Sequence, residues 1–179
     1  MEDLSLHILD IAENSINAGA TLIDIVIREQ KTQDMLTLEI RDNGTGMDDA
    51  TVVSTRNPFY TTRTTRRIGL GLPLLEEATR AADGMLEIVS RTGAGTDIRA
   101  TFRLSHIDRK PLGDMAATIV MLVAGNPDIN FTYRHEHESE TFTFSTKEIR
   151  LKYPGLDFNS PETLSFIRDY IREYTASFS

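Results

Sequence analysis

The segment from Asp42 to Met47, with the sequence DNGTGM, has the residue types of a ligand-binding turn. Gly44 and Gly46 can adopt positive φ and let a ligand come close to the backbone. Asp42 ends a stretch in which apolar residues alternate, so its carboxylate is expected at the floor of a pocket, where it can accept a hydrogen bond from an amino group. The alternative is an ordinary hairpin turn.

Polar side chains recur at helical spacing near the N-terminus. His7, Asp10, Asn14 and Asn17 are three or four residues apart, so they form one line along a helix. Such lines usually face water, but this one has no Lys, Arg or Glu, the residues typical of a solvated face. Asp10 and Asn14 are one turn apart, about 6 Å, and could act on the same ligand.

A locally basic segment runs from residue 51 to residue 75 of this acidic chain. It has no acidic residue but contains Arg56, Arg63, Arg66 and Arg67, with several threonines between them. In a chain of net charge −8, this composition favours a polyanion site.

Two glycines close the basic segment. Gly69 and Gly71 directly precede a helical pattern that includes Leu74 and Leu75, and free amides at a helix start can bind phosphate. An ordinary surface loop is the alternative.

The composition is that of a soluble globular domain. The chain has 179 residues, 40% of them hydrophobic and 26% charged, and no cysteine, which excludes disulfides and thiolate metal sites. No apolar run approaches the roughly 18 residues of a membrane span, and the N-terminus is acidic, unlike a signal peptide. We therefore expect a cytoplasmic protein that binds neither membranes nor nucleic acid.

The elements that must position these residues follow from periodicity. A helix is expected over 4–18, strands over 22–28 and 35–41, and a short helix over 48–55. A helix that includes Leu74 and Leu75 is expected after Gly71 and ends at Asp83-Gly84, and a hairpin of strands 85–92 and 97–104 follows. After a linker at 106–113, the pattern predicts a helix over 114–123, hairpin strands at 130–133 and 141–145, and a helix from Pro161 to about Tyr174. His135 and His137 lie near the tip of that hairpin, where a solvated tip is favoured over a metal site.

Taken in order, these stretches resemble the ATP-binding domain of the GHKL superfamily, which includes gyrases, histidine kinases, mismatch-repair ATPases and related chaperones. Residues 10–21 (DIAENSINAGAT) resemble its asparagine box in the mismatch-repair form, and Asp42 to Gly46 its first glycine box. Residues 58–62 (PFYTT) and 69–72 (GLGL) resemble the lid and second glycine box of histidine kinases, and Gly95-Thr96 the last box.

The resemblance implies ATP and Mg²⁺ as ligands. Asn14 would hold the Mg²⁺ that bridges the phosphates, and Asp42 would bind the adenine amino group. Thr96 would help hold Asp42 and the adenine through its hydroxyl or a water. Gly44 and Gly46 would let the base approach the backbone, and Gly69 and Gly71 would approach the phosphates. The nucleotide-binding residues that it implies are Asn14, Asp42, Gly44, Gly46, Met47, Thr61, Thr62, Arg63, Gly69, Leu70, Gly71, Leu72 and Thr96.

The chain departs from the family pattern at two positions. Asp10 stands where hydrolysing members carry a glutamate base, and Arg67 where histidine kinases often have glycine. Asp10 is the catalytic candidate. Only nine residues precede it, so we expect a stand-alone domain without a phosphoacceptor-histidine dimerisation domain.

Three functions remain open from the sequence. The favoured one is an ATP-dependent protein kinase in signal transduction that transfers the γ-phosphoryl group to a His, Ser or Thr of a partner protein. The others are an ATPase switch that drives partner binding or dimerisation, with a homodimer as one assembly, and a non-catalytic nucleotide sensor. The expected fold is an α/β two-layer sandwich, a mixed β-sheet with helices on one face, over residues 1–104. Residues 105–179 are expected to form a small α+β C-terminal extension of unknown role, packed on the first part.

Overall fold

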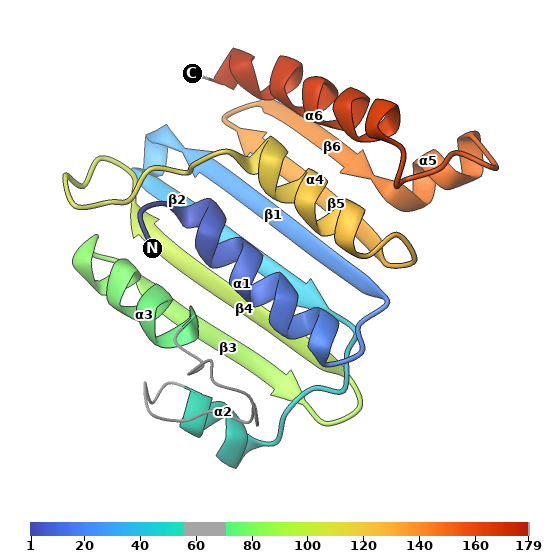
Figure 1. Cartoon of the computed structure of the whole chain (residues 1–179). Coiled ribbons are helices and arrows are strands. Elements are labelled where there is room, and N and C mark those ends of the chain that lie inside the picture. The colour runs from blue at the N-terminus through green and yellow to red at the C-terminus, as the bar shows by residue number, and fades with distance from the viewer. Residues whose placement is uncertain (56–70, 179) are drawn as a thin grey trace.

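The chain is organised around one mixed β-sheet. The computed structural model describes residues 1–55 and 71–178. The sheet has six strands in the order β3-β4-β2-β1-β5-β6 (Figure 1). The strands are β1 (Leu22–Gln30), β2 (Met35–Asp42), β3 (Met85–Arg91), β4 (Gly95–Arg103), β5 (Asn130–His137) and β6 (Glu140–Ser145). β1 and β5 are parallel, and the other neighbouring strands are antiparallel.

Helices cover one face of this sheet (Figure 1). The covering helices are α1 (Leu4–Asn17), α3 (Gly71–Ala81), α4 (Met115–Gly125) and α6 (Pro161–Thr175), and α1 contacts both α3 and α4. The shorter elements are η1 (Lys31–Gln33), α2 (Asp49–Thr55), α5 (Thr146–Lys152) and η2 (Ala176–Phe178). This arrangement confirms the predicted α/β sandwich. Among the described residues, no helix combines the length and apolarity that a membrane span requires.

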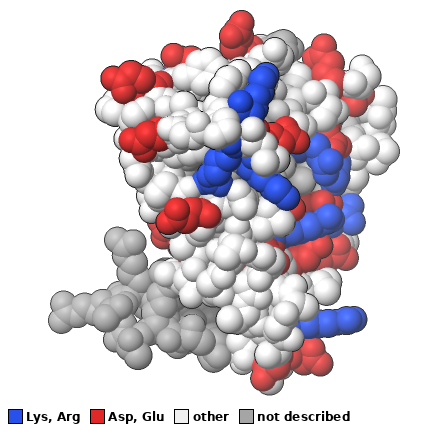
Figure 2. Space-filling model, turned by 90° about the vertical axis from the view of Figure 1, so that its right-hand side faces the viewer, with Lys and Arg blue, Asp and Glu red and all other residues white. Residues whose placement is uncertain are grey.

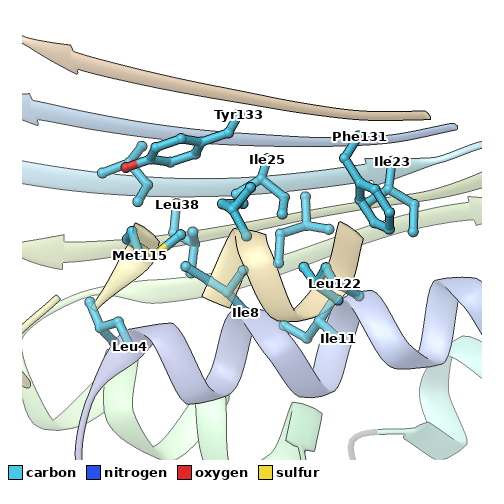
Figure 3. Close-up of a cluster of buried hydrophobic side chains, with 14 of the residues drawn as sticks. Leu4, Ile8, Ile11, Ile23, Ile25, Leu38, Met115, Leu122, Phe131 and Tyr133 are labelled. Carbon is cyan, nitrogen blue, oxygen red and sulfur yellow. The ribbon is translucent and has the colours of Figure 1, made fainter. Parts of the chain in front are cut away.

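The core fills the space between the helices and the sheet (Figure 3). Leu4, Ile8 and Ile11 are at most 1% exposed and form the apolar stripe of α1. On the sheet side, alternate residues of the strands point toward them, as Ile25 and Tyr133 do (Figure 3). Full burial of one such side chain stabilises the fold by about 1.5–3 kcal/mol. The stripe therefore holds α1 against the sheet, and this also fixes the position of Asp10 and Asn14, which lie on other sides of the helix.

The C-terminal part extends the same sheet. β5 pairs in parallel with β1, in a register that places Tyr133 opposite Ile25, and β6 adds the edge strand. One helix of this part, α5, is not among the sequence expectations. It starts directly after β6, where Ser145 Oγ accepts a hydrogen bond from the Glu148 amide at 3.4 Å. The proposed boundary at residue 104 stays a prediction.

The environment of two histidines differs from the expected solvated hairpin tip. β5 continues to His137, and the alternation of the strand turns both His135 and His137 toward the helical layer, where they are 3% and 9% exposed. His135 Nε2 lies 2.8 Å from Glu29 Oε1, and this hydrogen bond is the main cause that lowers the pKa of Glu29. Its Nδ1 lies 3.1 Å from the hydroxyl of Tyr133, whose pKa is raised by burial. These histidines are structural, and the expectation of a solvated tip is wrong.

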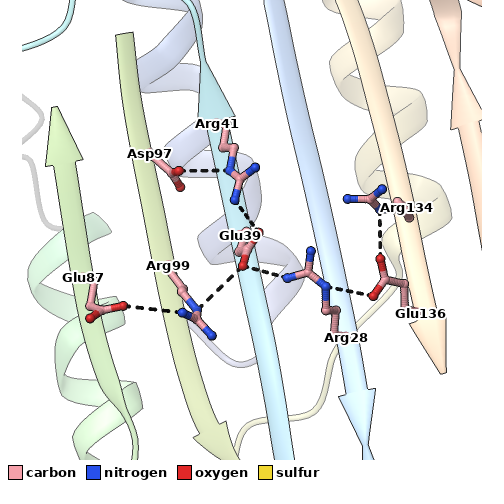
Figure 4. Close-up of polar contacts among 8 residues, drawn as sticks. All are labelled: Arg28, Glu39, Arg41, Glu87, Asp97, Arg99, Arg134 and Glu136. Carbon is pink, nitrogen blue, oxygen red and sulfur yellow. Dashed lines mark hydrogen bonds and ion pairs between the residues drawn. The ribbon is translucent and has the colours of Figure 1, made fainter. Parts of the chain in front are cut away.

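The other face of the sheet carries paired charges (Figure 4). The Glu39 side chain, 6% exposed, accepts from Arg28 at 2.7 Å and from Arg41 at 3.0 Å, and Arg99 lies 3.7 Å away. Figure 2 also shows acidic and basic side chains interspersed on the side of the molecule that it presents. Mixed, paired charges of this kind do not make a surface that attracts a polyanion.

Candidate nucleotide-binding site

Asp42 is held in place at the end of β2. Its Oδ2 accepts a hydrogen bond from Ser15 Oγ of α1 at 2.6 Å, and its Oδ1 accepts one from the Gly44 amide at 2.8 Å. The side chain is half-buried between helix and sheet. A carboxylate offers about four lone-pair sites, so Asp42 keeps acceptor capacity for a ligand after these two bonds.

The turn after Asp42 is packed so closely that side chains cannot be added. Gly46 has φ +65°, and a Cβ there would lie 2.0 Å from the Arg91 carbonyl oxygen. Gly95 has φ +86°, and its Cβ would lie 1.9 Å from the Asp42 carbonyl oxygen. The loop after β2 therefore rests directly on the β3–β4 turn. The sequence assigned these glycines to turn chemistry and ligand approach, and close backbone packing is a further requirement.

Ser90 links two of the predicted residues. Its Oγ accepts a hydrogen bond from the Met47 amide at 2.8 Å and lies 2.9 Å from Thr96 Oγ1. Thr96 is the residue opposite Asp42 in the β2–β4 ladder. It belongs to β4, although the sequence suggested that it lies in the turn before the strand. Ser90 thus ties Met47 and Thr96 together beside Asp42.

The start of α3 lies against the carboxylate of Asp10. A Cβ at Gly71, the first residue of α3, would meet Asp10 Oδ2 at 1.7 Å. Asn14 follows Asp10 by one turn on α1, and Leu72 is half-buried against the core. The first residues of a helix have backbone amides without intrahelical partners. The carboxylate of Asp10 and the N-terminal end of α3 are therefore neighbours.

The predicted residues that the structure describes meet around α1. Asp10 and Asn14 lie on α1 itself, while Asp42, Gly44, Gly46 and Met47 come from β2 and its loop. The remaining described ones come from β4 and α3: Thr96, Gly71 and Leu72. The other predicted residues lie outside the described part of the chain: Thr61, Thr62, Arg63, Gly69 and Leu70.

Two residues of the site were missed by the sequence reasoning. Neither Ser15 nor Ser90 was singled out from the sequence. Ser15 is only 4% exposed, and a buried hydroxyl needs a partner, which Asp42 provides. The available signal for Ser15 was its position on the otherwise apolar side of α1, next in sequence to Asn14 of the polar line.

The donor set fits Mg²⁺ and a nucleotide. Asp10 and Asn14 present a carboxylate and an amide on successive turns of α1, and Mg²⁺ prefers oxygen ligands while keeping several waters. In the described residues, no group of three or more His, Asp or Glu side chains is arranged to hold a metal. An ion that relies on one or two protein ligands and the phosphates of a substrate is compatible with this set.

Comparisons with known proteins find the same domain. Residues 2–106 match the family of histidine kinase-, DNA gyrase B-, and HSP90-like ATPases. The chain is 39% identical over 105 residues to sensor protein kinase FleS of Pseudomonas aeruginosa, covering 59% of this chain and 25% of that protein. It is 32% identical over 91 residues to sensor histidine kinase YvrG of Bacillus subtilis, covering 49% of this chain and 15% of that protein.

A solved structure shares the fold. The crystal structure of the N-terminal domain of a DNA repair protein matches with a TM-score of 0.57 at 16% identity, covering 82% of this chain and 53% of that chain. The chain thus spans about half of this structure and a quarter or less of the two kinases. Because the family match extends over residues 2–106, more than half of the sequence, the chain belongs to the family of histidine kinase-, DNA gyrase B-, and HSP90-like ATPases.

Proposed function

We propose that this chain binds Mg-ATP between α1 and the sheet and transfers the γ-phosphoryl group to a His, Ser or Thr of a partner protein. The observation that carries the proposal is the Asp42 carboxylate, which Ser15 and Gly44 hold at the end of β2 with acceptor capacity to spare. The resemblance to two proteins named as sensor kinases supports the choice of reaction. A cytoplasmic role in signal transduction belongs to the same proposal.

Recognition of the base would depend on Asp42 and the neighbouring glycines. A carboxylate that is already oriented by two donors loses little freedom when it accepts from the adenine amino group. Gly44 is buried, and the Ala18 carbonyl and Asp42 Oδ1 lie 2.9 and 3.1 Å from a Cβ built on it. A side chain at this position would therefore crowd the carboxylate that reads the base.

Positioning of the phosphates would depend on α1 and α3. Asn14 would hold Mg²⁺, which when bound neutralises phosphate charge. The free amides at the start of α3 would contribute further positive potential. In a transfer, the acceptor atom bonds to the γ-phosphorus while the bond to the bridging oxygen breaks and ADP leaves. Such a reaction needs positioning and charge neutralisation more than covalent help from the protein.

One observation favours a second function, ATP hydrolysis. Asp10 lies directly against Gly71, so its carboxylate is near the place where the start of α3 would hold phosphate. There it could take a proton from an attacking water. An ATPase switch is therefore kept as the alternative, and a sensor without turnover would retain binding alone.

Asn14→Ala is expected to weaken binding of ATP in the presence of Mg²⁺ by about tenfold or more, because one ligand of the ion and one anchor of the phosphates are lost. Calorimetric titration with and without Mg²⁺ measures the effect. Asn17→Ala is the matched control, since Asn17 is also an exposed asparagine near the end of α1. Equal affinities for Mg-ATP in both variants would remove Asn14 from the site.

Asp10→Asn separates transfer from hydrolysis. The proposal expects labelled phosphate from γ-labelled ATP to appear on a co-purified partner protein, and Asp10→Asn to leave this labelling largely intact for a histidine acceptor. For Ser or Thr, which benefit from a base, labelling should fall. Glu13→Gln, an exposed acid on α1, serves as the control. Release of free inorganic phosphate that Asp10→Asn abolishes, with no protein labelled, would contradict the kinase and establish the ATPase.

A further inference from the structure

His7 is a buried polar side chain that lies next to the backbone of Gly71 and is poorly paired. It is 1% exposed, and within the described part of the structure neither Nδ1 nor Nε2 has a well-aligned hydrogen-bond partner, the backbone of Gly71 being close enough for a weak hydrogen bond. This placement corrects the sequence interpretation, in which His7 began a polar line that continued with Asp10. Buried polar groups are nearly always paired, and an unpaired one carries a desolvation penalty. The ring therefore calls for a reason other than packing.

The ring is neutral at physiological pH. Its pKa is lowered from 6.5 to about 4, chiefly by burial and then by the positive charges of Lys110 and the N-terminal amino group. The negative charge of Asp3 and a hydrogen bond with the backbone of Gly71 oppose this lowering of the pKa. Since the unfolded chain takes up the proton first, the folded state loses stability as pH falls from 6.5 toward 4. A neutral imidazole has one donor and one acceptor nitrogen, and the weak hydrogen bond with the Gly71 backbone engages at most one of them.

The position of His7 relates it to the phosphate end of the site. It precedes Asp10 by three residues and Asn14 by seven, which places all of them on one side of α1. The backbone of Gly71, the first residue of α3, lies near enough to the ring to influence its pKa. The same glycine packs against Asp10. His7 and Asp10 thus both lie next to Gly71, in the first turn of α3.

The distance along α1 matches the length of a nucleotide. Ser15, which binds Asp42 at the base end, follows His7 by eight residues, or about 12 Å of helix. This span is comparable to that between the base and the last phosphate of an extended nucleoside triphosphate. Asp10 lies in between, five residues before Ser15 and three after His7. His7 is therefore at the far end, beside the amides that open α3.

We propose that His7 is a positioning residue for the terminal phosphate of a bound nucleoside triphosphate. Its imidazole hydrogen-bonds to the first turn of α3 in the ATP-bound state and orients the free amides of that turn toward the terminal phosphate. This role rests on the proposed ATP binding. It also accounts for a buried ring whose contact with the backbone of Gly71 is weak, since that contact tightens when the ligand binds at the start of α3.

The test is the ratio of the affinities for ATP and ADP, both with Mg²⁺, measured by calorimetry. His7→Leu is expected to lower the affinity for ATP about tenfold relative to that for ADP, the equivalent of one hydrogen bond. His7→Gln, which restores a donor and an acceptor, should recover most of the ratio. The free His7→Leu protein should be as stable as the wild type or more so, because a buried, poorly paired group is removed.

One control variant and one replacement variant complete the experiment. Ser5→Ala alters another buried polar residue of the first turn of α1 and should leave the ratio unchanged. If His7→Leu does not fold, His7→Met is measured in its place. Equal losses for ATP and ADP, or an unchanged ratio, would overturn the role of His7 while leaving ATP binding intact. A wild-type protein that binds neither nucleotide would overturn the proposed function and this inference with it.

Discussion

Asp42→Asn should reduce the affinity for ATP by roughly ten- to a hundredfold. The carboxylate accepts from Ser15 Oγ and the Gly44 amide, one bond on each oxygen. Asparagine can keep its oxygen on the Gly44 amide and donate its Nδ2 to Ser15 Oγ, which can then donate to the Ile11 carbonyl, but the adenine amino group loses its charged acceptor. Loss of a hydrogen bond to a charged group costs about 1.5–3 kcal/mol, which corresponds to this change in affinity.

Two further variants define the effect. Asp48→Asn changes an exposed aspartate of the same loop that accepts from the Thr51 amide at 2.8 Å, and asparagine can replace it there, so binding should be unchanged. Ser15→Ala removes one of the two donors and should give an intermediate loss. Thermal unfolding of each variant reports whether the fold is kept. A folded Asp42→Asn protein with wild-type affinity in calorimetric titration would exclude Asp42 as the residue that reads the base.

Gly46→Ala is expected to have the largest effect on the folded state. The residue has φ +65°, which costs an L-residue about 1–2 kcal/mol, and the new Cβ would lie 2.0 Å from a backbone oxygen that cannot move alone. Overpacking adds about 1–3 kcal/mol, so we expect a loss of about 2–5 kcal/mol in the free energy of unfolding. ATP binding should be lost as well, because the loop that begins at Asp42 is displaced.

Gly93→Ala provides the matched comparison. Gly93 also has a positive φ, +80°, but a Cβ there would meet nothing within 4 Å. It should cost only the backbone strain, about 1–2 kcal/mol, and leave ATP binding near that of the wild type. Chemical denaturation and titration of both variants make the comparison. Equal losses of stability would mean that the approach of Gly46 to the Arg91 carbonyl is not what requires glycine.

The elements of residues 1–104 could be predicted because their signals are local. Period-two apolar residues marked β1 and β2, and the helical stripe of Leu4, Ile8 and Ile11 marked α1. The pairing of β5 with β1 could not be predicted, because it joins residues about a hundred positions apart, Ile25 and Tyr133, and no local pattern records the partner of a strand. α5 was missed although Ser145 and Glu148 form the sequence pattern of a helix start.

The sequence suggests the residue types of the candidate site but not the hydrogen bonds that hold them. Asp42, Asn14 and the glycines stay predictions, which could be made because their chemistry is visible in the sequence. Ser15 and Ser90 were not, because a serine is common in any position and becomes informative only when its partner is known. His7 was grouped with the polar line of α1 from its helical spacing alone, and spacing does not reveal that its side chain is buried.

The most direct test of the central claim is a map of the nucleotide contacts in the wild-type chain. Backbone amide signals of the ¹⁵N-labelled protein are recorded by NMR before and after addition of Mg-ATP. We predict large changes at Gly44 and Gly46, in the loop after β2, and at Gly71, which packs against Asp10 of α1, with Glu39 on the opposite face of the sheet unaffected. An unchanged spectrum, or changes confined to the face around Glu39, would contradict the claim that ATP binds between α1 and the sheet.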